Sequence, residues 1–140
     1  MMFAVLFLAA TMSGFHVQQL GTTSGFLSGL AIDSQDHLYY TTTNGNVFRF
    51  AGGASTLVAH VVTDANSNSG LLGLALIDDN SAVVHYTTYG QTYDVLSRID
   101  LTTGSEAIIH QFACDIDVPE RGSSPEHHGG NPTIGVDGSR

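Results

Sequence analysis

The chain repeats a strand pattern after 44 residues, and this repeat limits its fold more than any other feature. The stretch Gly29–Asp33 reads GLAID, and the stretch that begins at Gly73 reads GLALID. The two openings are therefore 73 − 29 = 44 residues apart. Repeats of about 40 to 50 residues that each hold four strands are typical of β-propeller blades.

Short apolar stretches separated by turn residues predict four strands in each repeat. Between the second and third stretches, Asn44-Gly45 predicts a type I′ hairpin turn, in which both central residues have positive φ. We expect the strands of the first repeat at 30–33, 37–42, 47–50 and 56–62, and those of the second at 71–77, 82–88, 95–100 and 106–112.

These strands predict an all-β chain with about two propeller blades of four antiparallel strands each. The blade-like repeats cover 25–65 and 70–112, and an insertion at 113–132 leads to the first strand of a third blade at 133–140. A closed propeller has roughly four to eight blades, so the sequence predicts the N-terminal part of a larger propeller. A two-sheet β-sandwich made from the same eight strands is the alternative fold.

The charge balance excludes two classes of partner. The chain has no Lys, four Arg and thirteen acidic residues, which gives a formal net charge of −9. A chain this acidic is not expected to bind nucleic acid or an anionic membrane surface.

Residues 1–14 form a candidate signal peptide. They contain an apolar run of the right length followed by Ser13 and Gly14, although no basic residue precedes the run. The run is too short to span a membrane as a helix, which needs about 20 apolar residues. The sequence thus predicts a secreted or periplasmic protein, with a buried strand or helix at Phe3–Ala9 as the structural alternative.

Candidate chemistry is confined to histidines, because the sequence contains no phosphate-binding glycine loop, zinc-type Cys/His spacing or G-x-S-x-G motif. The pair His127-His128 precedes two glycines in the longest connection, where a propeller places loops at the mouth of its channel. A histidine there can act as a general base, and a solvated polar loop is equally compatible with the spacing. Five isolated histidines are interpreted as structural: His16, His37, His60, His85 and His110.

Three segments occur in an order that resembles a known family. They read SNSGLLGLALIDDNSAVVHYTT, VLSRIDL and HHGGNPTIGVDG, and they extend over about 66–140. This ordered set resembles the glucose/sorbosone dehydrogenase family, the soluble quinoprotein sugar dehydrogenases. The resemblance implies a six-bladed propeller that binds pyrroloquinoline quinone (PQQ) and calcium at its mouth and oxidises a sugar hydroxyl.

The resemblance also implies roles for two residues. His127 matches the catalytic base at the start of the family's H-x-G-G motif, and His128 occupies the variable position. In that role the imidazole takes a proton from the sugar while hydride passes to the quinone. Asn68 lies two residues before the G-L-L-G motif and matches a cofactor-neighbouring position that often holds Gln or Glu.

The chain departs from the family pattern after the histidine motif. Asn131-Pro132 stands where the family often has a long polar residue, and 135–138 reads GVDG where GPDG is usual. The family's calcium ligands and the cations that hold the quinone carboxylates come from later blades. The 140-residue chain alone is therefore expected to be inactive, and no metal ligand is assigned within it. A non-catalytic propeller that binds a protein or a carbohydrate is the alternative function.

Overall fold

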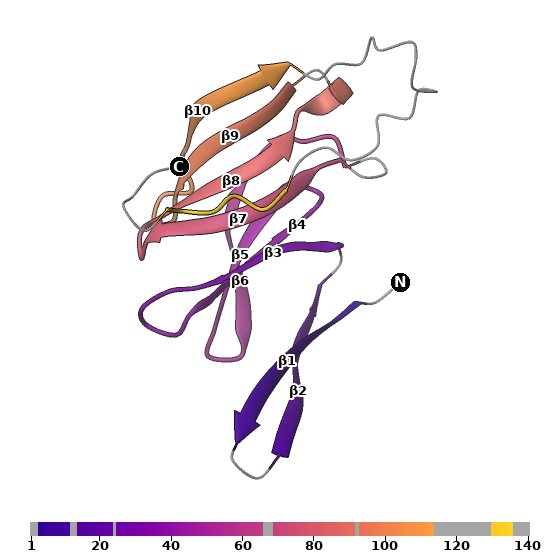
Figure 1. Ribbon diagram of the computed structural model, residues 1–140, viewed down its shortest axis with the longest axis vertical. Helices are drawn as coiled ribbons and strands as arrows, with labels where there is room; N and C mark the ends of the chain where they lie inside the picture. Colours follow the sequence, from indigo (N-terminus) through magenta and orange to yellow (C-terminus); the bar gives the residue numbers. More distant parts are fainter. Residues whose placement is uncertain are drawn as a thin grey trace.

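The computed structural model describes residues 3–11, 14–23, 25–65, 69–91, 93–113 and 130–135. Within these residues the chain forms β-strands, a short 3₁₀ turn at Tyr89–Gln91 and no α-helix (Figure 1). The all-β prediction is therefore confirmed.

Two four-stranded antiparallel sheets carry the predicted repeats. The first sheet, blade 1, consists of β3 (Leu27–Ile32), β4 (Leu38–Thr42), β5 (Asn46–Ala51) and β6 (Ala54–His60) in spatial order. The second, blade 2, consists of β7 (Leu71–Asp78), β8 (Ser81–Thr87), β9 (Tyr93–Asp100) and β10 (Glu106–Ala113). Each sheet is a simple meander, which is the topology of a propeller blade.

The 44-residue repeat extends to the pairing register. In blade 1, Gly29 pairs with Thr41, and in blade 2, Gly73 pairs with His85, so both partners shift by 44 residues. A register irregularity also lies immediately before each of the two glycines. The two blades thus share the same strand pairing and the same irregularity in their first strand.

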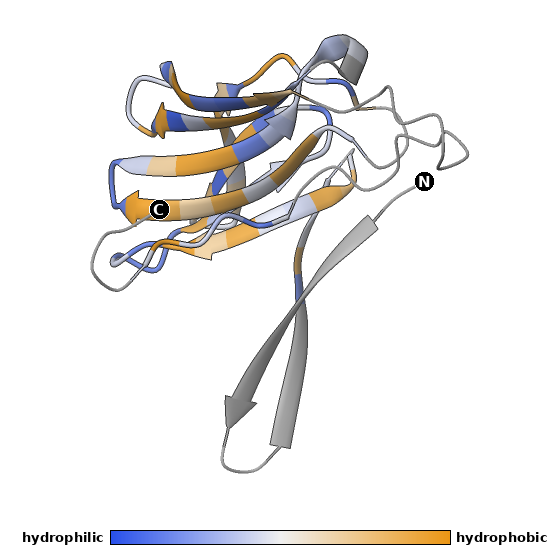
Figure 2. Ribbon diagram, turned by 45° about the horizontal axis from the view of Figure 1, so that its top comes forward, coloured by the Kyte–Doolittle hydropathy of each residue, from blue (hydrophilic) through white to orange (hydrophobic). Residues whose placement is uncertain are grey.

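The hydrophobic core lies between the two blades. Alternate residues of a strand point to opposite faces of the sheet, and the faces that meet are apolar in both blades. Figure 2 shows hydrophobic residues recurring along the strands of both blades. Burial of apolar area is the main favourable term in folding, so this interface is what holds the blades together. Its buried members from blade 1 and the connection that follows it are Tyr39, Val47, Ala59 and Val61, and those from blade 2 include Leu71, Leu74, Ala82, Val84, Tyr86, Val95 and Ile99.

Neighbouring innermost strands approach so closely that they require glycine. A Cβ atom on Gly29 would lie 2.7 Å from Thr41 Oγ1 and 2.9 Å from the backbone nitrogen of Leu74 in β7. A Cβ atom on Gly73 would lie 2.5 Å from Cδ of Pro132. Residues 130–135 therefore pack against β7 as β7 packs against β3, and Figure 1 shows this yellow segment along β7. This is the place of the next innermost strand, which was predicted at 133–140; residues 136–140 lie outside the described part.

The predicted type I′ turn at Asn44-Gly45 is wrong. Only Gly45 has a positive φ, of 91°, and its N–H donates to Thr42 O at 3.0 Å. The connection is a three-residue loop, which takes a type I turn followed by a left-handed glycine. Two positive φ values instead occur at Gly52-Gly53, 58° and 83°, in the two-residue turn that follows.

The N-terminal strands β1 (Phe3–Thr11) and β2 (Gly14–Thr23) pair as an antiparallel hairpin. The range Phe3–Ala9, for which a strand was one alternative, lies in β1. The end of β2 reaches the face of blade 1 that points away from blade 2, where Leu38, Tyr40 and Phe50 line a small cavity with it. In the described part of the chain, no helix is long and apolar enough to cross a membrane.

A polar contact joins the first turns of the two blades. Ser34 N donates to Asp79 Oδ1 at 3.0 Å, and the Ser34 hydroxyl donates to Asp79 Oδ2. These two hydrogen bonds favour the ionised carboxylate and lower the pKa of Asp79. The contact therefore depends on a charged Asp79.

We expect Gly29→Ala to lower the free energy of unfolding by about 1 to 3 kcal/mol, the usual cost of an added group in a packed site. Gly21→Ala is the matched control, since its Cβ would meet only Phe50 Cε2, at 4.0 Å. Denaturant titration followed by circular dichroism measures both. Equal midpoints for the two variants would contradict a requirement for close approach.

Asp79→Asn tests the polar link through its pH dependence. Because the folded pKa of Asp79 lies below the ordinary value of 3.8, its contribution is present above that pH and is lost as the pH falls through the folded pKa. We expect wild type to exceed Asp79→Asn in unfolding free energy at about pH 6, and the difference to shrink as the pH falls below 3.8. Asp36→Asn, in the exposed turn that carries Ser34, controls for the lost charge. A difference that does not change with pH would refute the role of the ionised carboxylate.

Candidate functional site

The two residues predicted to form the site, His127 and Asn68, lie outside the described residues. Their described neighbours are Gly130, three positions after His127, and Ser69, directly after Asn68. Both neighbours lie at the end of blade 2 where β7 begins. The two chain segments that carry the predictions therefore converge at one end of one strand.

The start of β7 is fixed by hydrogen bonds. Ser69 is buried, and its hydroxyl donates to Asp64 O at 2.7 Å. Gly70 has a φ of 120°, and its carbonyl accepts from Thr87 N at 2.9 Å. The position next to Asn68 is thus held by both the preceding connection and β8.

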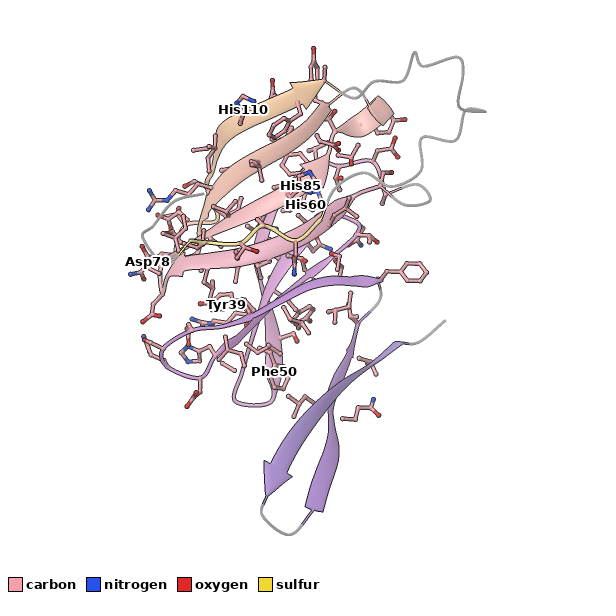
Figure 3. All side chains as sticks on the ribbon, in the orientation of Figure 1. Tyr39, Phe50, His60, Asp78, His85 and His110 are labelled. Carbon is pink, nitrogen blue, oxygen red and sulfur yellow. The ribbon has the colours of Figure 1, made fainter. Side chains whose placement is uncertain are left out.

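His85 holds the segment that follows the histidine pair. It lies in β8 on the face of blade 2 that points away from blade 1, and it is 8% exposed. Its Nδ1 lies 3.2 Å from the carbonyl oxygen of Gly130 (Figure 3). A carbonyl only accepts, so Nδ1 carries the proton and donates. His85 therefore connects the rigid sheet to the chain just after His127.

Asn131 makes a second connection. Its Oδ1 accepts a hydrogen bond from Leu74 N at 3.1 Å, and Gly73 leaves the space that this approach requires. Innermost strand β7 has no further strand of its own sheet on this side, so this side chain satisfies one of its backbone donors. Asn131, the short residue that departs from the family pattern, thus has a structural role, because its side chain binds the backbone of β7.

Tyr86, next to His85 in sequence, is not a base at neutral pH. Burial, and then its hydrogen bond to Glu106, raise its pKa to about 12. Its hydroxyl donates to Glu106 Oε1 at 2.7 Å, on the side of the sheet that faces blade 1.

The described residues do not fit calcium or PQQ at this end of the blades. In the described ranges, no three His, Cys, Asp or Glu side chains lie together as a metal-binding group. Quinone carboxylates call for cations, and the arginines in these ranges, Arg49 and Arg98, lie toward the opposite end of the sheets.

Sequence reasoning missed His85 and the role of Asn131. His85 was interpreted as a structural histidine, which its hydrogen bond supports, but its partner is the segment of the candidate site. The available signal was a polar residue in the middle of the apolar stretch AVVHYT, since buried polar groups nearly always have a hydrogen-bond partner.

The two blades and the adjoining third segment define a partial β-propeller. No family model matches the chain, and no curated protein matches it. The chain is similar in structure to a protein assigned as an oxidoreductase (glucose dehydrogenase) from Thermus thermophilus, with a TM-score of 0.62 at 21% identity. The match covers 81% of this chain and 35% of that protein. The chain therefore has the fold of part of that protein and spans about a third of its length.

The amide of Leu74 reports on the attachment of the third segment. We expect Asn131→Ala and His85→Ala each to speed hydrogen exchange at Leu74 N by about 5- to 10-fold, the effect of losing one hydrogen bond. His110→Ala is the matched control, because His110 belongs to the same cross-strand row as His85 but is exposed. Unchanged exchange in both test variants would show that neither contact anchors the segment.

Proposed function

We propose that these residues form part of a sugar dehydrogenase of the β-propeller type, an oxidoreductase that oxidises a sugar hydroxyl. The observation that carries the proposal is the convergence at the start of β7 of the segments bearing Asn68 and His127. The fold likeness to a protein assigned as a glucose dehydrogenase supports it. The proposed activity is that of the whole protein, in which the two blades and the adjoining segment would form one side of a six-bladed propeller.

In this proposal His127 is the general base. A neutral imidazole has a pKa near neutrality and can accept the proton of a sugar hydroxyl. His85 and Asn131 are positioning residues, since they fasten the chain after His127 to a rigid sheet. A base held by a scaffold in this way needs no reorganisation when the substrate binds.

PQQ and calcium belong to the proposal as the redox group and its metal. PQQ, when bound, would take up the hydride from the sugar carbon. Because the described residues supply neither a metal cluster nor a cation at this end, we assign them no contact with either group. Asn68 is proposed as a cofactor neighbour, and the protein is proposed to act outside the cytoplasm, in the periplasm or after secretion.

A non-catalytic propeller that binds a protein or a carbohydrate is the second candidate. It is favoured by the same lack of a metal-binding group and of a cation at the candidate site in the described part. The two candidates differ in whether sugar oxidation depends on His127.

The histidine pair supplies its own control. In the protein encoded by the complete reading frame that contains these residues, we expect His127→Ala to lower sugar-dependent reduction of a dye acceptor by about 100-fold or more, with PQQ and calcium present. His128→Ala should lower it little, because the resemblance places His128 at a variable position.

Absorbance titration with PQQ separates binding from proton transfer. We expect both variants to bind PQQ as wild type does, since the base acts on the sugar. Wild-type PQQ binding without sugar oxidation would exclude the dehydrogenase and favour the binding module. Equal activity of the two variants would overturn the assignment of His127.

A further inference from the structure

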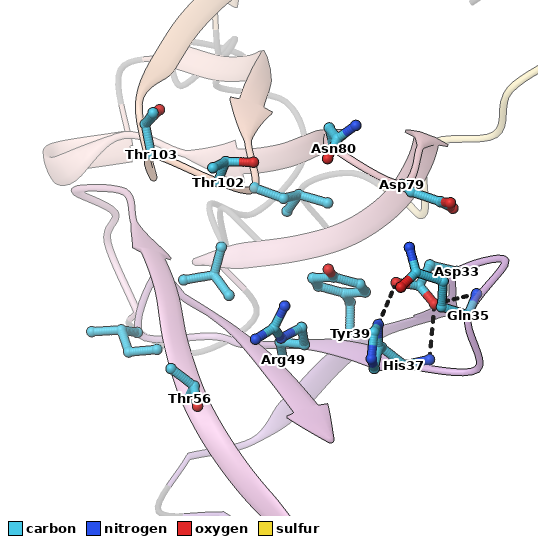
Figure 4. A pocket seen from close by; sticks show the side chains of 13 residues that line it. Asp33, Gln35, His37, Tyr39, Arg49, Thr56, Asp79, Asn80, Thr102 and Thr103 are labelled. Carbon is cyan, nitrogen blue, oxygen red and sulfur yellow. Dashed lines mark hydrogen bonds and ion pairs between the residues drawn. The ribbon is translucent and has the colours of Figure 1, made fainter. Parts of the chain in front are cut away.

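A cavity of about 360 Å³ opens between the two blades at the end opposite to the candidate site (Figure 4). Blade 1 contributes the faces of β4, β5 and β6. Three turns close the other sides: 33–37 between β3 and β4, 79–80 between β7 and β8, and 101–103 between β9 and β10. The volume lies within the range of small-molecule sites.

The turns around the cavity are fixed by their own carboxylates. Asp33 Oδ1 accepts from Gln35 N at 2.9 Å and His37 N at 2.8 Å, and its Oδ2 lies 2.9 Å from His37 Nδ1. Burial raises the pKa of Asp33, but these hydrogen bonds outweigh burial and lower it. Asp100 Oδ1 likewise accepts hydrogen bonds from Thr102 N at 2.9 Å and from Thr103 N at 2.8 Å. The walls are therefore pre-organised before any ligand arrives.

Four polar side chains line this cavity without a partner in the described part of the chain. Arg49 and Thr56 are cross-strand neighbours on blade 1. Asn80 and Thr102 belong to two turns of blade 2, and Figure 4 shows the two pairs on opposite walls. Together they offer a guanidinium fork, an amide and two hydroxyls, so the cavity presents both donors and acceptors.

The floor of the cavity includes apolar groups. They are the half-buried Val58 and the small accessible parts of Tyr39 and Leu101, which are 3% and 9% exposed. A surface with an apolar floor and a rim of unpaired donors and acceptors matches a ring that has C–H faces and hydroxyl edges. A neutral sugar has this distribution of groups.

We propose that this inter-blade cavity binds a neutral carbohydrate of one or two rings. Arg49 and Asn80 donate to its hydroxyl oxygens, and the hydroxyls of Thr56 and Thr102 exchange hydrogen bonds with it. An anionic ligand fits less well, because Asp33 and Asp79 line the same cavity. A metal cation fits less well too, because those two carboxylates already accept hydrogen bonds from the turns.

The test is a titration of the full chain with maltose, observed by backbone amide NMR. We expect saturable shifts at Arg49, Thr56 and Thr102, and none with gluconate, which carries a charge. Arg49→Gln and Asn80→Ala should each weaken maltose binding by about tenfold. Arg98→Gln is the matched control and should bind maltose as wild type does.

Each outcome decides the proposal. Loss of binding in both cavity variants, with dispersed spectra that show a folded chain, supports it. Wild-type affinity in both variants, or no saturable shift in the wild type, overturns it. Maltose shifts confined to His85 and 130–135 also overturn it and favour the candidate site instead. The inference does not depend on His127, so failure of the dehydrogenase proposal leaves it standing.

Discussion

The close approach of neighbouring innermost strands is the constraint on which the rest of the structure depends. Gly29 lets the backbone of β7 pack against β3, and Gly73 lets Asn131 and Pro132 pack against β7. A side chain on Gly29 would push β7 away from β3 and so separate the apolar faces of the two blades, and one on Gly73 would push residues 131–132 away from β7. The hydrogen bond from Asn131 to β7 is available for the same reason. One steric requirement thus sets both the core and the attachment of the segment after His127.

The sequence predicts the eight blade strands well because the signals for them are local. Apolar stretches and the turn residues between them lie within a few positions of one another, and the repeat doubles each signal. The turn type at Asn44-Gly45 was wrong because the loop has three residues, and loop length is set by pairing across the strands. The hairpin partner of β1, Gly14–Thr23, was not predicted, since its polar and apolar residues do not alternate regularly.

The candidate site is predictable only in part. The histidine pair stands out in the sequence because it lies beside glycines in the longest connection. The contact between His85 and Gly130 joins positions 45 residues apart, and no spacing rule indicates it. Asn131 was noted only as a departure from a family pattern, and its bond to Leu74 explains that departure. Non-local contacts of this kind follow from the propeller geometry and not from the motif.

The repeat also shows that one position carries different chemistry in the two blades. Arg49 pairs with Tyr39, and Arg98 pairs with Val83, which is Tyr39 shifted by 44 residues. The two arginines are therefore equivalent in their blades, yet their surroundings differ. Arg98 has Ala107 as its cross-strand neighbour where Arg49 has Thr56. The positive charge of Arg98 also helps to lower the pKa values of Asp78 and Asp100. In blade 2 the arginine at this position, Arg98, interacts with the carboxylates of its own turns. In blade 1 the equivalent Arg49 lines the cavity between the blades, where it can bind a ligand.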